Sequence, residues 1–495
     1  MLKNTFKKFG DHLMLIGALS GIALFIVRAL YVFSFDAPRH VITSGFEEES
    51  LFAVWKYTYG FPVYSDPHQV PFAASYFNWL FYQLYGGVTS FVLNNASLID
   101  DWLPSIARAI TLAIILMGCA LNYRLLKMAT PNQQPLNPAI SFSLSSFIWF
   151  GPLIGFWGLT VRPDVAGLFF DAIAAYCFLK YLPSRPRTAI LLAALGCYLS
   201  WSFKQVNIVM PIAIGLYLLW DRKWQLVFLF SGVLISAFAI TLWAASPNML
   251  NALLFVKTAL PFSFDVLQGN FLNLIKKTVP IISLLVGTAF ILKRHKKEPL
   301  NPMVILGLCG IIGWAITLLP ASSKVGSADN YHFIMLFFMV LIAAGALQQL
   351  QQHSLALQRN YAVAGLLMIF SIAVAFSQAS FKHLDTQHQD LIAIRECMQK
   401  LPKPLFVINH YAALPWMNQQ SFPFVLAYNY WNDRVDGESF EDNGIGGLID
   451  KSYFKTLILP VQITSTFDGA SLLPFQKETE VCPGYAVWSR NEESV

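Results

Sequence analysis

Long apolar runs recur along almost the whole chain and are separated by short polar segments. About 20 consecutive apolar residues are enough to cross a bilayer as a helix. Only 13% of the 495 residues are charged, whereas a soluble protein carries about 25%. This composition excludes a soluble enzyme, a disordered chain and a coiled coil, and it indicates a polytopic α-helical membrane protein. We predict about 11 spans, which start near Leu13, Leu103, Ala139, Asp164, Thr188, Val206, Trp224, Leu274, Pro302, Tyr331 and Tyr361.

The basic residues between these runs predict an orientation, because Lys and Arg are enriched in cytoplasmic loops. With a cytoplasmic N-terminus, every second loop is basic, at residues 124–127, 185–187, 222–223, 293–297 and 359. We therefore expect a transmembrane domain over residues 1–380 and an extracytoplasmic lobe over residues 381–495.

The first outer loop, residues 36–102, is predicted to contain helices that lie on the membrane surface. Residues 73–93 are apolar enough to span, but they carry Asn78, Gln83 and many aromatic side chains, which prefer the interface. A span here would also place the later basic loops outside, which the charge rule disfavours.

The C-terminal segment is the only long polar one, and it predicts a small α/β lobe. Residues 405–409, 456–460 and 485–489 are typical of strands and alternate with Gly, Asn, Asp and Pro clusters. Cys397 and Cys482 lie here and can form a disulfide if the lobe is extracytoplasmic. His410 and Tyr411 follow the first strand; they are compatible with binding an acceptor sugar and equally with ordinary packing on a membrane surface.

Three consecutive carboxylates, Glu47, Glu48 and Glu49, are the most unusual feature of the first loop. The residues after them repeat at i, i+4 and i+8 on one face of a helix, at Leu51, Trp55 and Tyr59. One interpretation is that the carboxylates only cap this helix, whose dipole stabilises negative charge at its N-terminus. The other is that one of them is a general base for an acceptor hydroxyl.

The motif order in this loop resembles the GT-C superfamily of polyprenyl-phosphate-sugar-dependent glycosyltransferases, and within it the protein O-mannosyltransferase and lipid A aminoarabinose transferase type. The shared elements are the acidic run, an amphipathic helix that ends at Gly60, the segment 64–67, Pro71 and an aromatic helix. The resemblance implies a GT-C-like core and an inverting glycosyltransferase with a lipid-phosphate sugar donor. Tyr64 and Asp66 are then expected to shape the loop or the acceptor path.

The resemblance also assigns the base, with one departure from the family pattern. Many relatives have Asp-Glu at this place, whereas Phe46 precedes Glu47 in this chain. Glu47 is therefore the expected base, with Glu48 as the second candidate.

A second group of polar residues is expected at the outer ends of later spans. Taken singly, each is typical of a snorkelling or ion-paired side chain. Jointly they place cations where a polyprenyl phosphate would need them, and similar elements recur in the GT-C relatives. The expected donor phosphate and sugar site consists of Arg162, Asp164, Lys204, Gln205, Lys324, Asn330 and Tyr331, and Arg28 late in the first span either joins it or snorkels outward.

The expected partners are a polyprenyl-phosphate-linked sugar, an acceptor glycan, lipid or protein hydroxyl, and membrane lipid, with no nucleic acid. His40 and His68 lack metal-ligand spacing, so we expect no obligatory metal; a divalent ion that assists stays open. The expected location is the bacterial inner (plasma) membrane. The alternatives are a transporter or flippase of lipid-linked saccharides, which usually shows internal repeats, and a scaffold whose lobe binds a partner.

Overall fold

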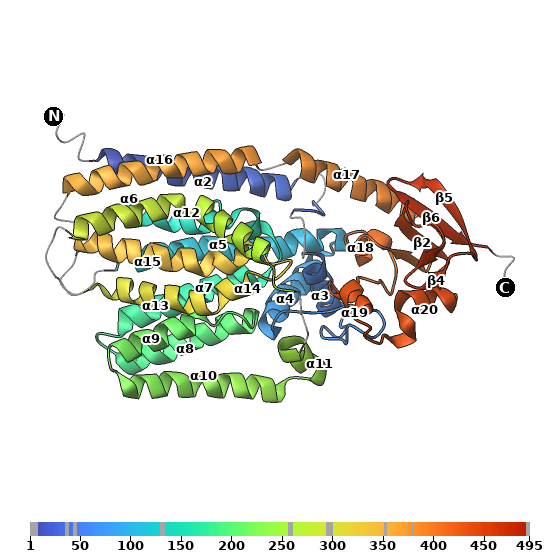
Figure 1. The fold of residues 1–495 in the computed structure, drawn as a ribbon, viewed down its shortest axis with the longest axis horizontal. Helices are drawn as coiled ribbons and strands as arrows, with labels where there is room; N and C mark the ends of the chain where they lie inside the picture. Colours follow the sequence, from blue (N-terminus) through green and yellow to red (C-terminus); the bar gives the residue numbers. More distant parts are fainter. Residues whose placement is uncertain are drawn as a thin grey trace.

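The computed structural model describes residues 8–34, 39–42, 47–128, 134–255, 261–293, 300–350, 354–378 and 381–491. Each of the predicted apolar runs coincides with a helix. These helices are α2 (Phe9–Val32), α5 (Leu103–Leu126), α6 (Pro138–Phe150), α7 (Pro163–Tyr181), α8 (Pro186–Phe203), α9 (Val209–Trp220), α10 (Trp224–Ala244), α12 (Phe264–Lys293), α13 (Pro302–Ile316), α15 (Phe333–Gln349) and α16 (Ser354–Gln378). Figure 1 shows them lying roughly along the long axis of the molecule, with the lobe at the opposite end from the N-terminus.

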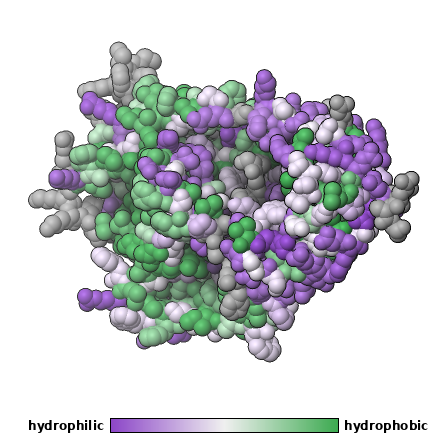
Figure 2. All heavy atoms as spheres, turned by 45° about the vertical axis from the view of Figure 1, so that its right-hand side comes forward, coloured by the Kyte–Doolittle hydropathy of each residue, from purple (hydrophilic) through white to green (hydrophobic). Residues whose placement is uncertain are grey.

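Within the described residues, seven helical segments are long and apolar enough to cross a membrane. They contain α2, α5, α10, α12, α13, α15 and α16, while α6 and α9 are apolar but shorter. The polytopic helical architecture is therefore confirmed, and the number of 11 spans stays a prediction. Figure 2 shows hydrophobic residues prevailing on the bundle and hydrophilic residues on the lobe, as this architecture requires.

Proline at the first helical position begins several of the helices and permits short connections. Pro138, Pro163, Pro186 and Pro302 occupy this place, where the missing N–H costs nothing and the fixed φ suits the helix. The turn between α7 and α8 spans only residues 182–185. Short turns of this kind make sequential helices antiparallel neighbours.

The first and last long helices of the bundle pack closely against each other because glycines line their contact. A Cβ atom at Gly17 of α2 would lie 2.7 Å from the Cβ of Met368, and one at Gly365 of α16 would lie 2.5 Å from the backbone of Leu13. Small residues allow such close approach where no hydrophobic effect drives helices together.

Helices α3 (Glu48–Thr58) and α4 (Trp79–Ala96) lie between the bundle and the lobe (Figure 1). Helix α4 is not among the segments that meet the span criteria, and its placement on the membrane surface stays a prediction. Short elements complete the bundle end of the molecule: η1 (Asp100–Trp102), η2 (Gly155–Leu159), α11 (Pro247–Leu250), η3 (Asn251–Phe255), α14 (Leu318–Ala321) and η4 (Asp329–His332).

The lobe contains helix α17 (Phe381–Met398) and a four-stranded sheet in the order β1-β2-β6-β5. Strands β1 (Leu405–Val407) and β2 (Thr456–Pro460) are parallel, and β6 (Tyr485–Arg490) pairs antiparallel with β2 and with β5 (Phe475–Cys482). The smaller elements are α18 (Pro415–Asn418), α19 (Tyr430–Val435), η5 (Glu441–Asn443), α20 (Gly444–Asp450) and the hairpin of β3 (Thr466–Phe467) and β4 (Ala470–Ser471). This agrees with the predicted α/β lobe. A disulfide joins Cys397 of α17 to Cys482 of β5, with 5.6 Å between the Cα atoms.

The segment between α3 and α4 packs into the lobe. Phe72 is fully buried in the apolar core of the lobe, and its carbonyl accepts a hydrogen bond from the Ala427 N–H at 2.7 Å. The Tyr76 hydroxyl donates to Asn429 at 2.7 Å, and His68 Nε2 lies 3.1 Å from a carboxylate oxygen of Asp433. Loop and lobe therefore form one folded unit despite about 350 intervening residues.

Two buried histidines form a further contact between the end of the bundle and the lobe. The His40 N–H donates to Nδ1 of His388 on α17 at 3.4 Å, and the two ring centroids are 5.6 Å apart. Burial lowers the pKa of His40 to about 3 and that of His388 to about 4. His388, Arg108 and Arg395 also lower the pKa of His40. Arg39 and Arg108 lower the pKa of His388, whereas Asp385 raises it.

We predict that acid weakens this contact. In the unfolded chain both histidines bind a proton near pH 6.5. In the folded protein both stay neutral until about pH 4. The free energy of unfolding therefore falls as the pH drops from 7.5 to 5. The loss is up to about 1.4 kcal/mol per histidine for each pH unit below 6.5. Thermal unfolding in detergent at several pH values measures it, and His388→Asn should reduce the pH-dependent part. An equal melting temperature at pH 7.5 and 5 would contradict the prediction.

Candidate functional site

The first carboxylate of the acidic run, Glu47, is held in a fully buried ion pair with Arg108 of α5. Arg108 Nε and Nη2 donate to the two oxygens of Glu47 at 2.9 and 2.7 Å, and both side chains have 0% exposure. The Val161 N–H donates to the same carboxylate at 2.9 Å. Glu47 thus accepts three hydrogen bonds, and it fixes the start of α3 against α5 and against the turn before α7.

Arg108, the partner of Glu47, was not singled out by the sequence analysis. Its guanidinium also donates to the carbonyls of Arg39 and His40, so it organises the chain just before the acidic run. A signal was present, since Arg108 is a single cation inside an otherwise apolar run. An ionisable group at such a place needs a partner in the interior of the protein.

Glu48, the next carboxylate, is buried but only partly satisfied. Its side chain is 7% exposed, and its Oε2 atom has no hydrogen-bond partner among the described residues. Tyr411 of the lobe lies near this carboxylate, and burial together with Glu48 and Glu47 raises the pKa of the Tyr411 hydroxyl well above 10. The structure therefore brings together Glu48 and Tyr411, which are 363 positions apart in the sequence. His410, which directly precedes Tyr411, is half-buried.

Glu49, the third carboxylate, points to a different part of the lobe. Its Oε1 atom accepts the Tyr428 N–H at 2.6 Å. Burial and the neighbouring Glu48 raise the pKa of Glu49 to about 8, although Arg162 and Lys56 act in the opposite direction. The acidic run thus presents three different environments, and of the predicted donor-site cations Arg162 acts on Glu49.

Asp164 at the start of α7 is the centre of a second polar cluster. Lys204 Nζ lies 2.6 Å from Asp164 Oδ1, Asn330 Nδ2 donates to the same oxygen at 2.8 Å, and Arg162 Nε lies 3.6 Å from Oδ2. The ammonium of Lys204 is 5.0 Å from the ring centroid of Tyr331. The structure therefore brings together five of the predicted donor-site residues from three separate segments; we call these five the Asp164 cluster.

The other two predicted donor-site residues lie apart from this arrangement. Gln205 follows Lys204, but its amide donates to the carbonyl of Tyr76 at 2.9 Å and so fixes the first loop. Lys324 is exposed, its backbone pairs with that of Phe262, and no hydrogen bond or ion pair of the described structure joins it to the Asp164 cluster.

Tyr64 and Asp66 have contacts that shape the first loop. The Tyr64 hydroxyl donates to the carbonyl of Phe77 at 2.9 Å, and Asp66 accepts the N–H of His68 at 2.9 Å. Phe77 in turn lies under the guanidinium of Arg162, with 4.9 Å between the group and the ring centroid. The loop therefore forms one wall of the Asp164 cluster.

A cavity of about 820 Å³ adjoins the Asp164 cluster between α2, α12 and α16. Its wall is largely apolar, with Leu367, Phe370 and Val374 from α16, and its basic side chains are Arg28, Lys276, Lys277 and His383. Trp157 and Asp329 line the cavity and also connect it to the cluster, because Arg162 lies 5.3 Å from the Trp157 ring and Asn330 follows Asp329.

Arg28 is the most unusual residue of this cavity. It is 5% exposed, and within the part of the chain that the structure describes its Nε and Nη1 atoms have no hydrogen-bond partner; the guanidinium lies 4.7 Å from the Phe156 ring centroid. A buried cation without a hydrogen-bonding partner is costly. An anionic ligand in the cavity would remove that cost.

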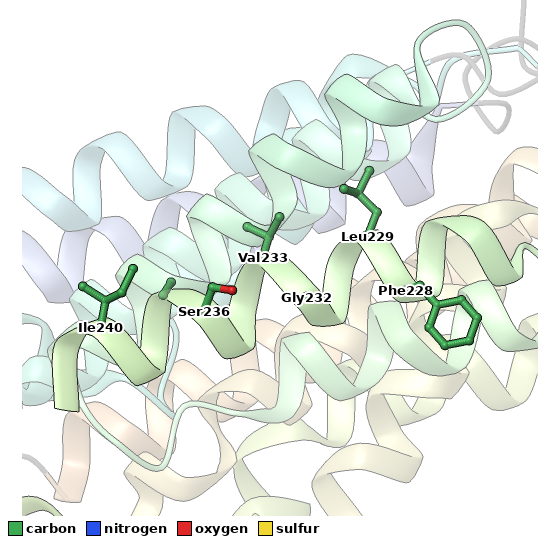
Figure 3. Close-up of a pocket in the computed structure, with 7 residues that line it drawn as sticks. Phe228, Leu229, Gly232, Val233, Ser236 and Ile240 are labelled. Carbon is green, nitrogen blue, oxygen red and sulfur yellow. The ribbon is translucent and has the colours of Figure 1, made fainter. Parts of the chain in front are cut away.

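A shallower hollow of about 500 Å³ lies on α10 (Figure 3). All of its lining residues come from that one helix, and they are apolar apart from Ser236. Such a surface suits contact with lipid and offers no chemistry. Among the residues that the structure describes, no three His, Cys, Asp or Glu side chains lie close enough to hold a metal ion.

Known structures match this arrangement at the level of the fold. The chain is similar to ArnT from Cupriavidus metallidurans in the apo state, with a TM-score of 0.60 and 12% identity over 96% of this chain and 97% of that one. For ArnT bound to undecaprenyl phosphate, the TM-score is 0.59 and the identity 12%, over 96% and 98% of the chains. AglB, an oligosaccharyltransferase from Archaeoglobus fulgidus, has a TM-score of 0.49 and 12% identity over 99% and 75%.

No protein-family model and no curated sequence matches the chain. At 12% identity the likeness to ArnT shows the fold. The architecture expected from the loop motifs is thereby confirmed at the level of an ArnT-like fold.

The buried pair predicts a large effect on stability. Arg108→Met leaves the Glu47 carboxylate buried without its counter-ion, which should cost about 3–5 kcal/mol. The matched control is Lys451→Gln, which breaks an exposed pair with Asp442 and should cost less than about 1 kcal/mol. Denaturant unfolding in detergent measures both.

Adding Glu47→Gln to Arg108→Met removes the unpaired charge and should restore part of the lost stability. A single Arg108→Met variant as stable as the Lys451→Gln control would show that the pair does not anchor α3.

Proposed function

We propose that this protein is a membrane glycosyltransferase that moves a sugar from a polyprenyl-phosphate donor to an acceptor hydroxyl on the extracytoplasmic side. The observation that carries the proposal is the buried Arg28, whose Nε and Nη1 atoms have no hydrogen-bond partner among the described residues, in a largely apolar cavity that adjoins the Asp164 cluster. An apolar wall beside such a cation fits a lipid with a phosphate head. One of the similar ArnT structures holds undecaprenyl phosphate, which supports this ligand class.

The cavity and the Asp164 cluster fit two parts of one donor. The prenyl chain would lie against the apolar side chains of α16, with its phosphate near Arg28 and the exposed Lys276. The sugar would lie toward Asp164, Lys204 and Asn330, where carboxylate, ammonium and amide can hydrogen-bond to hydroxyl groups. The cations would also stabilise the charge that develops on the leaving phosphate.

Glu48 is the base in this proposal. Glu47 was the first expectation, but its oxygens already accept three hydrogen bonds, two of them from a buried arginine. Glu48 has a buried oxygen without a partner, which leaves a lone pair for an acceptor hydroxyl. Tyr411 would hold the other side of the Glu48 carboxylate in place.

The reaction is then a single displacement. The acceptor oxygen bonds to the anomeric carbon while the bond from that carbon to the phosphate oxygen breaks, and polyprenyl phosphate leaves with the electron pair. Glu48 takes the hydroxyl proton, and oxocarbenium-like charge develops on the sugar. Attack from the side opposite the phosphate would invert the anomeric configuration. The acceptor class, whether glycan, lipid or protein, is left open by this geometry.

We predict that Glu48→Gln lowers sugar transfer by at least about 100-fold without loss of folding, because the amide cannot take the proton. Glu47→Gln should instead reduce the yield of folded protein, since it leaves Arg108 buried and unpaired. Glu396→Gln, on the exposed side of α17, is the matched control and should be unchanged. The measurement is transfer from a panel of labelled polyprenyl-phosphate sugars by purified protein.

Transfer by Glu48→Gln at the wild-type rate would remove Glu48 from the role of base. A wild-type protein that moves the labelled lipids across proteoliposomes without transferring the sugar would favour the alternative, a flippase.

For the location, we propose the inner membrane of a bacterium with a cytoplasmic N-terminus and the lobe outside. The disulfide between Cys397 and Cys482 supports this orientation, because disulfides persist in oxidising compartments. We predict that alkylation of protein from intact cells modifies these two cysteines only after reduction, as mass spectrometry of the lobe peptides would show. Modification of both without reductant would contradict the pairing and weaken the orientation.

A further inference from the structure

The cavity proposed for the donor phosphate contains its own competing anion. Lys277 and Asp329 both line it, and Lys277 Nζ forms a close ion pair with Asp329 Oδ2. The other carboxylate oxygen, Oδ1, is buried without a hydrogen-bond partner. The side chains are 32% and 14% exposed, so the lysine is the more accessible member of the pair.

Asp329 also begins the turn that reaches the Asp164 cluster. It is the first residue of η4, and the next two residues, Asn330 and Tyr331, contact Asp164 and Lys204. The turn is fixed from behind by Trp314, whose Nε1 donates to the carbonyl of Tyr331 at 3.0 Å. A change in the partner of Asp329 therefore acts directly on the segment that positions the cluster.

Sugar transfer raises the charge of the phosphate. The donor is a phosphodiester with one negative charge. When its bond to the anomeric carbon breaks, the leaving polyprenyl phosphate is a monoester with about 1.5 to 2 negative charges at pH 7. The cations of the cavity therefore bind the product more strongly than the substrate, and a transferase of this kind needs a means to release it.

Resting on the function proposed above, we propose that Asp329 competes with polyprenyl phosphate for Lys277 and thereby speeds product release. While the lipid phosphate is bound, Lys277 pairs with it and Asp329 lies without its counter-ion. That state is costly for a carboxylate with only 14% exposure. When Lys277 pairs with Asp329 again, the carboxylate regains its counter-ion and the lipid phosphate is displaced.

The test is equilibrium binding of undecaprenyl phosphate, which needs no knowledge of the sugar. Purified wild-type protein and variants are titrated with the lipid in detergent, with undecaprenol and inorganic phosphate as separate arms. Asp329→Asn removes the competitor and should tighten lipid binding about five-fold, the effect of breaking one partly exposed ion pair. Lys277→Gln should weaken binding, and the double variant should match Lys277→Gln.

Two variants serve as controls. Asp329→Glu keeps the competing charge and should bind like wild type. Asp221→Asn breaks a comparable ion pair with Lys223, at a distance of 2.8 Å in the turn before α10, and should have no effect. Undecaprenol should bind more weakly than the phosphate ester in every folded variant, and inorganic phosphate more weakly still.

Equal or weaker lipid binding by a folded Asp329→Asn variant would overturn the proposal. So would unchanged binding by Lys277→Gln, which settles the question even if Asp329→Asn does not fold. Failure of the proposed function gives a different result, namely lipid binding that follows these expectations in a protein that transfers no sugar.

Discussion

The ion pair between Glu47 and Arg108 is the interaction on which the end of the bundle next to the lobe depends. Both groups are fully buried, where separated charges are far more costly than in water. The pair and the Val161 N–H join the start of α3, the second turn of α5 and the turn before α7. Glu48 and Arg162 each follow one of these anchored residues directly, so the pair sets where both can lie.

The lobe contributes to the site rather than covering it. Tyr411 contacts Glu48, Tyr428 contacts Glu49, and Phe72 of the first loop is buried in the lobe core. The orientation of the acidic run is therefore set from both sides, by the bundle through Arg108 and by the lobe through backbone and phenol groups. This explains how adjacent carboxylates acquire different hydrogen-bonding environments.

The few charged residues divide by environment. Cations of the short turns, such as Arg185 and Arg222, are exposed. The buried and half-buried cations meet specific partners. Lys204 pairs with Asp164, Lys277 with Asp329, and Arg108 with Glu47. Arg28 differs because two of its donor atoms lack a hydrogen-bond partner, and this difference gives the cavity its proposed anionic ligand.

The sequence by itself determined the helical membrane class, the position of each long helix, the strands β1, β2 and β6 of the lobe and the residue types that form the Asp164 cluster. The length of an apolar run and the order of motifs depend on neighbouring residues, so they can be read from the sequence alone. Only the tertiary structure decided the partner of Glu47, the separation of Lys324 from the cluster, and the place of Tyr411 and Asp329. These depend on contacts between distant segments, which residue type and spacing do not encode. Arg108 is an example: the apolar run around it indicates that it is buried, but nothing in the sequence identifies Glu47 as its partner.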